Sequence, residues 1–205
     1  MLYKVIAKAL DYIIVKRLNN LEVVGLDHKP YTNRYVVTCN HESYNEIVLL
    51  GLALFPNEIH YMAKQELFKT KLMNRFFTAL NAFPVNRDNP GPSTLKTPVK
   101  LLNANKTVGI FPSGHRTSVE VPLKRGAATI AMLGKAPILP AAYVGPTKIL
   151  HMFTKKAYIK FGEPIDTTAI PKDLKRQEKV DYITTLLTER TRTLQKELND
   201  YVNAK

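Results

Sequence analysis

The sequence has little cysteine and no long apolar run. One cysteine among 205 residues excludes an internal disulfide framework and is typical of a protein in a reducing compartment. No apolar run reaches the roughly 18 to 20 residues that span a bilayer, and no segment resembles a cleavable signal peptide. Internal repeats and low-complexity segments are lacking too. We therefore expect a single domain, residues 1–205, with one sizeable core.

Acidic residues are also scarce. The chain has 17 acidic residues against 30 lysines and arginines, which leaves a formal net charge of +13. Such an excess predicts a polyanionic partner: nucleic acid, an anionic membrane or a phosphorylated substrate. The sequence lacks zinc-finger spacing, an aromatic RNA-binding string and a tail dense in lysine and arginine, and its positive charge is spread along the chain. We therefore expect no nucleic-acid partner.

Apolar runs of strand length alternate with longer segments of helical periodicity. Strands are expected at 21–25, 34–40, 59–63, 82–85, 107–111, 137–144 and 157–161, and helices at 43–54, 65–80, 93–104, 124–133 and 172–203. This alternation predicts an α/β fold in which helices flank a mixed β-sheet. The polar loops that follow the strands are where ligands of open α/β folds collect.

The N-terminal segment has the pattern of an amphipathic helix. Within residues 2–18, the charged side chains of Lys4, Lys8 and Asp11 lie on one side of a helical wheel. Apolar residues fill most of the rest of the wheel. A wide apolar arc followed by two basic residues favours a helix that lies in a membrane interface. The alternative is a helix packed on the core. We expect residues 1–20 to be a membrane-interface helix and residues 21–205 the catalytic α/β core.

A histidine and a glutamate stand where the second expected strand passes into a helix. His41 lies just before the first helical turn and Glu46 one turn inside it, so the imidazole can hydrogen-bond the carboxylate. Such a bond fixes one tautomer and leaves the other ring nitrogen free to take a proton. His41 is therefore a candidate general base.

Two other readings of this stretch stay open, and a third, a metal site, is disfavoured. A histidine before a helix is often a cap or a satisfied core residue. Cys39 and His41 point to the same side of a strand and could form a nucleophile pair, although a cysteine at a strand end is usually a small buried hydrophobe. A zinc site on one helix face needs a second histidine at helical spacing, and none follows.

Three further blocks follow the pair His41 and Glu46 along the chain: FPVNR at 83–87, FPSGHRTS at 111–118 and ILPAAY at 138–143. Taken in order, these four blocks resemble the glycerolipid acyltransferase family, and most closely its bacterial 1-acyl-sn-glycerol-3-phosphate acyltransferases. His41 and Glu46 are similar to the family's histidine and aspartate, which four residues separate. The resemblance runs from about residue 37 to residue 146, and it implies the glycerolipid acyltransferase fold.

The resemblance also implies a reaction. A fatty acyl group would pass from an acyl thioester to the 2-hydroxyl of 1-acyl-glycerol 3-phosphate (lysophosphatidic acid), giving phosphatidic acid for phospholipid biosynthesis. Because that hydroxyl has a pKa far above 7, a base must remove its proton, and His41 held by Glu46 would do so. Acyl-coenzyme A or acyl carrier protein would be the co-substrate, with no cofactor and no metal. The enzyme would sit peripherally or monotopically on anionic phospholipid at the cytoplasmic face of the cell membrane.

The family blocks further imply a phosphate site and a substrate loop. Arg87 and Arg116 would bind the substrate phosphate, since guanidinium groups bind phosphate oxygens in pairs. Ser113 and Gly114 would complete the loop, with Gly114 letting the backbone approach the ligand. The sequence departs from the family pattern where aspartate is replaced by Glu46 and glutamate by Ser113. Another glycerophosphate or lysophospholipid acceptor, or a catalytically weak membrane-binding relative, is the alternative.

Overall fold

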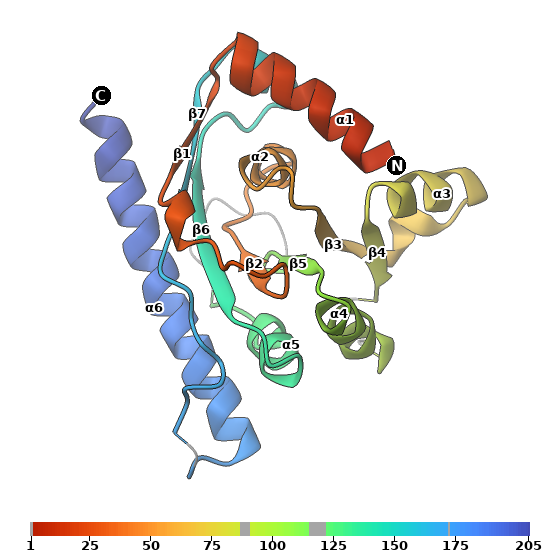
Figure 1. The fold of residues 1–205 in the computed structure, drawn as a ribbon, viewed down its shortest axis with the longest axis vertical. Helices are drawn as coiled ribbons and strands as arrows, with labels where there is room; N and C mark the ends of the chain where they lie inside the picture. The colour runs from red at the N-terminus through yellow and green to blue at the C-terminus, as the bar shows by residue number, and fades with distance from the viewer. Residues whose placement is uncertain (1, 87–90, 115–121, 172) are drawn as a thin grey trace.

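The structure is a computed structural model that describes residues 2–86, 91–114, 122–171 and 173–205. Its described residues form one α/β domain around a seven-stranded sheet with strand order β1-β7-β6-β2-β5-β3-β4 (Figure 1). The strands are β1 (Leu21–Val24), β2 (Val36–Thr38), β3 (Ile59–Lys64), β4 (Ala82–Val85), β5 (Thr107–Ile110), β6 (Ile138–Val144) and β7 (Ala157–Phe161). Neighbouring strands are parallel except β6 and β7, which are antiparallel. The predicted mixed sheet is confirmed.

Helices cover both faces of the sheet. One face carries α1 (Leu2–Leu10) and α2 (Asn45–Ala53), and the other carries α4 (Ser93–Asn103), α5 (Gly126–Leu133) and α6 (Arg176–Asn203) (Figure 1). The short helix α3 (Lys71–Ala79) lies near the edge strand β4. The remaining helical turns are π-helix η1 (Asp11–Arg17) and the 3-10 turns η2 (Leu26–His28), η3 (Gln65–Phe68) and η4 (Ile149–Phe153).

The central strand β2 shows why the sheet needs two layers of helices. Val36 and Val37 are adjacent in sequence and both 0% exposed, yet they belong to different core clusters. Successive side chains of a strand point to opposite faces, so each valine is covered by its own helical layer. Burying such a side chain contributes about 1.5–3 kcal/mol to the stability of the fold. The packing of β2 therefore holds the start of the following loop in place.

The expected helix over residues 65–80 is interrupted, which corrects that prediction. Residues 65–68 form a 3-10 turn, and α3 begins only after Thr70. Thr70 has an extended backbone, and its side chain accepts a hydrogen bond from the Met73 amide at 3.2 Å. A threonine in this role starts a new helix, so local capping overrode the continuous helical pattern.

The N-terminal helix packs on the core along one stripe. Tyr3, Ala7 and Ile14 are buried in the cluster that α2 also joins. Val5 and Tyr12 remain 61% and 60% exposed. Core packing therefore accounts for one side of this segment, and contact with a membrane by the other side stays a prediction. No helix in the described part of the chain is both long and apolar enough to cross a bilayer.

Candidate active site

Parallel pairing brings the predicted site loops to one edge of the sheet. β2 pairs in parallel with both β5 and β6, and β3 pairs in parallel with β4 and β5. The carboxyl ends of these strands therefore lead into loops at the same edge. Three of the four sequence blocks, those around residues 41, 111 and 143, meet there.

His41 and Glu46 are hydrogen-bonded, as the sequence predicted. The distance from His41 Nδ1 to Glu46 Oε1 is 2.7 Å, and the two residues are 7% and 0% exposed. Glu46 lies in the first turn of α2, which begins at Asn45, and not one turn inside as expected. A carboxylate can only accept, so Nδ1 carries the proton and Nε2 keeps a free lone pair. The imidazole also stacks on Phe111, with ring centroids 4.3 Å apart.

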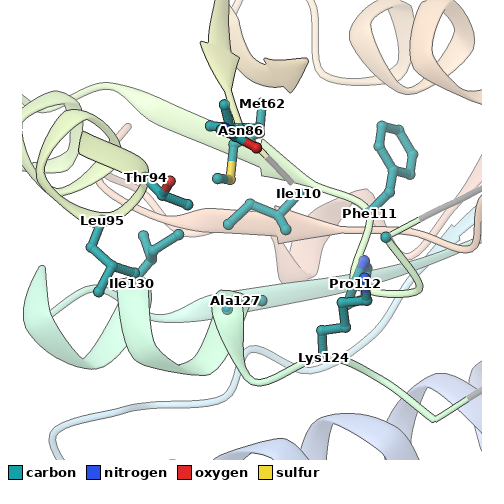
Figure 2. Close-up of a pocket in the computed structure, with 13 residues that line it drawn as sticks. Met62, Asn86, Thr94, Leu95, Ile110, Phe111, Pro112, Lys124, Ala127 and Ile130 are labelled. Atoms are coloured by element: carbon teal, nitrogen blue, oxygen red, sulfur yellow. The ribbon is translucent and has the colours of Figure 1, made fainter. Parts of the chain in front are cut away.

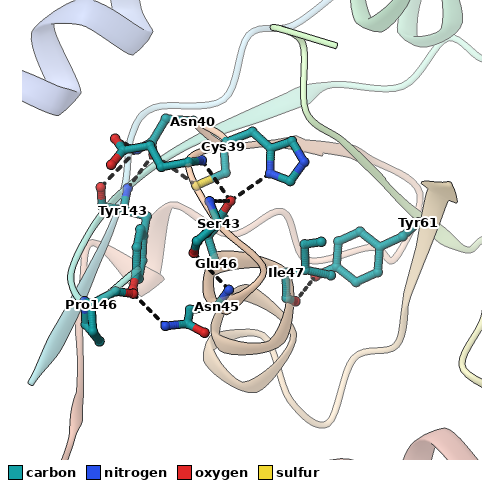
Figure 3. Close-up of polar contacts among 11 residues, drawn as sticks. Cys39, Asn40, Ser43, Asn45, Glu46, Ile47, Tyr61, Tyr143 and Pro146 are labelled. Carbon is teal, nitrogen blue, oxygen red and sulfur yellow. Dashed lines mark hydrogen bonds and ion pairs between the residues drawn. The ribbon is translucent and has the colours of Figure 1, made fainter. Parts of the chain in front are cut away.

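Glu46 is fixed by more than the histidine. Its Oε1 atom accepts backbone N–H groups of Glu42 at 2.9 Å and Ser43 at 2.8 Å, and its Oε2 atom accepts the Ser43 hydroxyl at 2.5 Å (Figure 3). Sequence reasoning missed Ser43. The signal was present, because a serine three residues before a glutamate at a helix start is the pattern of a capping box.

The Glu46 carboxyl is ionised at neutral pH despite its burial. Burial raises the pKa of this group, but hydrogen bonds from His41 and Ser43 outweigh that effect, and the pKa is lowered from its ordinary value. A buried carboxylate with four donors can stabilise a positive charge on the adjacent imidazole. The pair is therefore suited to cycle between imidazole and imidazolium.

Two asparagines tie this loop to the end of β6. Asn40 accepts from the Tyr143 amide at 2.7 Å and donates to the Tyr143 carbonyl at 3.0 Å (Figure 3). Asn45 donates to the carbonyls of Pro146 at 2.5 Å and Lys148 at 3.0 Å. The fourth sequence block, residues 138–143, thus supports the loop that carries the histidine and glutamate.

Cys39 does not have the surroundings of a nucleophile. It is 1% exposed, and its thiol donates to Asn40 Oδ1 at 3.3 Å. Burial raises the pKa of the thiol well above its ordinary value, which disfavours the reactive thiolate. None of the hydrogen bonds among the described residues joins Cys39 to His41. The same part of the chain holds no cluster of three or more metal-ligating side chains.

An apolar cavity of about 260 Å³ lies on the α4 and α5 side of the sheet. Phe111 is among the residues that line it, although its ring points away from the other lining side chains (Figure 2) and stacks on His41 at the α2 side of the sheet. Most of the other lining side chains are apolar and come from β3, β4, β5, α4 and α5: Met62, Val85, Leu95, Ile110, Ala127 and Ile130 (Figure 2). The cavity has the apolar lining with few polar groups that is typical of ligand sites.

Lys124 is a cation at this cavity that sequence reasoning did not single out. Its backbone N–H donates to the Pro112 carbonyl at 2.8 Å, and its side chain lies over Gly114. A Cβ on Gly114 would meet the Lys124 Cε and Nζ atoms at 2.7 Å, and Gly114 has a φ of +78°. Glycine is therefore favoured here by its backbone conformation, whereas the flexible Lys124 side chain could move away from a Cβ atom. Lys124 makes no ion pair with any of the described residues.

The other predicted substrate-binding residues are placed only in part. Ser113 is 8% exposed, and its neighbours Pro112 and Gly114 line the cavity. Arg87 and Arg116 lie outside the described residues. Asn86, which precedes Arg87, lines the cavity (Figure 2), so the second block reaches the same place as the third.

Comparison with known proteins identifies the family. The sequence model described as Acyltransferase matches residues 20–144. The chain is also 43% identical over 199 residues to a 1-acyl-sn-glycerol-3-phosphate acyltransferase of Bacillus subtilis, covering 97% of this chain and 99% of the relative. The chain belongs to the acyltransferase family.

Two further proteins show the same likeness at lower identity. A 1-acyl-sn-glycerol-3-phosphate acyltransferase of Streptococcus pneumoniae is 34% identical over 140 residues, covering 67% of this chain and 52% of that protein. The crystal structure of a 1-acyl-sn-glycerophosphate (LPA) acyltransferase from Thermotoga maritima matches with a TM-score of 0.66 at 20% identity, over 94% of this chain and 80% of that one. This structural likeness shows that the acyltransferase shares the fold. The family resemblance found in the sequence is confirmed.

Proposed function

We propose that this acyltransferase moves a fatty acyl group from an acyl thioester to the 2-hydroxyl of 1-acyl-glycerol 3-phosphate, giving phosphatidic acid. One observation carries the proposal: His41, held by Glu46 at 2.7 Å, stacks on Phe111, a residue that is also among those lining an apolar cavity. A base and an apolar cavity that both adjoin the end of β5 suit a substrate with a hydroxyl and an acyl chain. The Bacillus subtilis relative carries the name of this activity.

His41 is the general base in this proposal. Its Nε2 atom takes the proton of the acceptor hydroxyl while the oxygen attacks the thioester carbonyl. The Glu46 carboxylate keeps the proton on Nδ1 and stabilises the imidazolium that forms. Collapse of the tetrahedral intermediate breaks the carbon–sulfur bond, and the imidazolium returns its proton to the departing thiolate. The products are the ester and a free thiol, and no acyl-enzyme forms.

In this proposal the cavity holds the acyl chain of the acceptor, and three basic residues bind its phosphate. An acyl chain fits the apolar walls formed by Met62, Ile110 and Ile130. The phosphate requires positive charge, which Arg87, Arg116 and Lys124 supply. The loop of Ser113 and Gly114 contacts the glycerol group. Lys124 acts as a point charge, whereas arginine can bind two phosphate oxygens at once.

The proposal needs no cofactor. Acyl-coenzyme A or acyl carrier protein serves as co-substrate, and both are anionic, as the net charge of +13 favours. The acceptor and the product are bilayer lipids, so the enzyme works peripherally on an anionic phospholipid surface, at the cytoplasmic face of the cell membrane. The N-terminal helix, with Val5 and Tyr12 exposed, contributes to that contact.

An acceptor comparison tests the function. With one acyl-coenzyme A donor, we expect lysophosphatidic acid to be acylated in preference to glycerol 3-phosphate and to lysophosphatidylcholine.

Replacing Lys124 tests the phosphate site. Lys124→Met should raise the KM for lysophosphatidic acid about tenfold, the effect of losing one exposed charge-assisted contact of ~1.4 kcal/mol, with kcat little changed. Lys196→Met, on the exposed side of α6, is the matched control. Equal rates with all three acceptors would contradict the proposed acceptor, and an unchanged KM would exclude Lys124 from the phosphate site.

A further inference from the structure

Helix α3 keeps its apolar side chains in solvent. None of its nine described residues is buried. Leu72 is 77% exposed, Phe76 43% and Met73 40%. Leu67, in the preceding turn η3, is 39% exposed. By contrast, α4 buries Pro98 and Leu102 against the sheet. Because large apolar side chains that gather in solvent mark interaction sites, α3 requires an explanation other than core packing.

The apolar and charged side chains of α3 lie on opposite sides of the helix. At about 100° per residue, one side carries Leu72, Met73, Phe76 and Phe77, and the other carries Lys71, Asn74, Arg75 and Thr78. Phe77 packs on Phe68 of the preceding turn, with ring centroids 5.7 Å apart. The helix has two exposed basic residues and no acidic residue, and exposed Lys69 precedes it. This combination of an apolar side with flanking cations is typical of helices that lie in an anionic membrane interface.

The exposed surface of α3 is linked to that of the N-terminal helix. Glu58 accepts a hydrogen bond from Asn81, two residues after α3, at 2.7 Å, and pairs with Lys4 of α1 at 3.3 Å. Glu58 thus joins the first turns of α1 to the residue that follows the end of α3. On α1, Leu2 is 39% and Val5 61% exposed. Exposed apolar side chains from two separate segments therefore gather at the same end of the molecule.

We propose that α3, with Leu67, Leu72, Met73 and Phe76 as its apolar contacts, is a second membrane-binding element that docks on anionic phospholipid beside α1. Lys69, Lys71 and Arg75 meet the lipid phosphates while the apolar side chains enter the interface. This inference rests on the proposed function, because it names how the enzyme reaches a lipid acceptor.

Docking through α3 also orients the cavity. Strand β4 follows α3 and ends at Val85, and both Val85 and Asn86 line the cavity. A strand of four residues is about 13 Å long, so the cavity lies within a short distance of the surface that α3 presents. A lysophospholipid whose chain lies in the bilayer then has a short path to the cavity.

Vesicle binding tests the inference separately from catalysis. We would sediment the full chain with vesicles of phosphatidylcholine containing phosphatidylglycerol, comparing wild type with Leu72→Asp. The substitution removes one inserted apolar side chain and adds a charge, so the partition coefficient should fall about tenfold or more. Tyr182→Asp, an exposed aromatic on α6 at 47%, is the matched control and should bind as wild type does. Circular dichroism and Tm would verify that each variant is folded.

A second variant separates lipid from an acidic protein as the occupant of α3. Lys71→Glu with Arg75→Glu should lose binding to vesicles that contain phosphatidylglycerol and should make the residual binding insensitive to salt. Unchanged vesicle binding by folded Leu72→Asp would overturn the inference. The inference would also be overturned if the Lys71→Glu, Arg75→Glu variant bound vesicles normally and lost activity only with acyl carrier protein as donor, because α3 would then dock the carrier protein. Neither result touches the proposed function, which is tested separately by the acceptor comparison and by the formation of phosphatidic acid.

Discussion

Replacing His41 by alanine should lower kcat by about 10²- to 10⁴-fold, the usual contribution of a general base. The acceptor hydroxyl cannot lose its proton readily at neutral pH without a base, and His41 is the side chain whose free Nε2 faces away from Glu46. The KM for either substrate should change little, because the imidazole acts in the transition state. Steady-state kinetics with a chromogenic thiol reagent would measure both constants.

The fold should survive this substitution. His41 is nearly buried and stacks on Phe111, so His41→Ala will cost some stability, and Tm should be measured beside kcat. His151→Ala, in the 3-10 turn η4 (Ile149–Phe153), is the matched control and should retain wild-type kcat. A His41→Ala protein with kcat within a few-fold of wild type would remove His41 from the mechanism.

Replacing Glu46 by glutamine should have the second-largest effect. The amide keeps the shape of the side chain but carries no negative charge opposite the imidazolium, so kcat should fall about 10²- to 10³-fold, as when one charge-stabilising group is lost. Glu189→Gln, an exposed position on α6, should change nothing. Glu46→Asp restores the residue that is usual in the family and should retain more activity than the glutamine variant. Equal kcat in wild type and Glu46→Gln would show that the carboxylate has no catalytic role.

The same substitution has a pH signature in stability. The pKa of Glu46 is lowered in the folded protein, since donors from His41 and Ser43 outweigh the burial that raises it. A depressed carboxyl pKa stabilises the fold above the unfolded value of about 4.3 and ceases to do so as pH falls through the folded value. Thermal denaturation between pH 3 and 7 should therefore show the wild-type advantage over Glu46→Gln at neutral pH and its decline in acid. A difference that is constant across this range would contradict the assignment.

Much of the fold follows from local patterns, and the particular failures have physical causes. Val36 and Val37 sit in a short apolar run between polar loops, and that run predicts a fully buried central strand whatever the order of the sheet. The break at Thr70 was missed because a single capping hydrogen bond, worth about 1 kcal/mol, favours a new helix after Thr70 over one continuous helix through residues 65–80. Sheet order itself depends on long-range pairing, and no local pattern indicates that β6 and β7 are antiparallel.

The site divides in the same way. The His41–Glu46 hydrogen bond lies within one loop and the first turn of one helix, so residue spacing was enough to predict it. Ser43 was readable from its capping pattern. Lys124 was not, because its position over Gly114 depends on how the loop after β5 returns to α5, and a basic residue before a helix carries no sequence signal of its own. The cavity beside Phe111 likewise combines side chains from five elements.

The most direct test of the account follows two products in one reaction. Purified protein would be mixed with lysophosphatidic acid in vesicles and a long-chain acyl thioester, and free thiol and phosphatidic acid would be measured together. Acyl transfer with His41 as base predicts one phosphatidic acid for each thiol released by wild type, and almost none of either with His41→Ala. Thiol release matched by free fatty acid, or no product with either coenzyme A or carrier-protein donors, would contradict it.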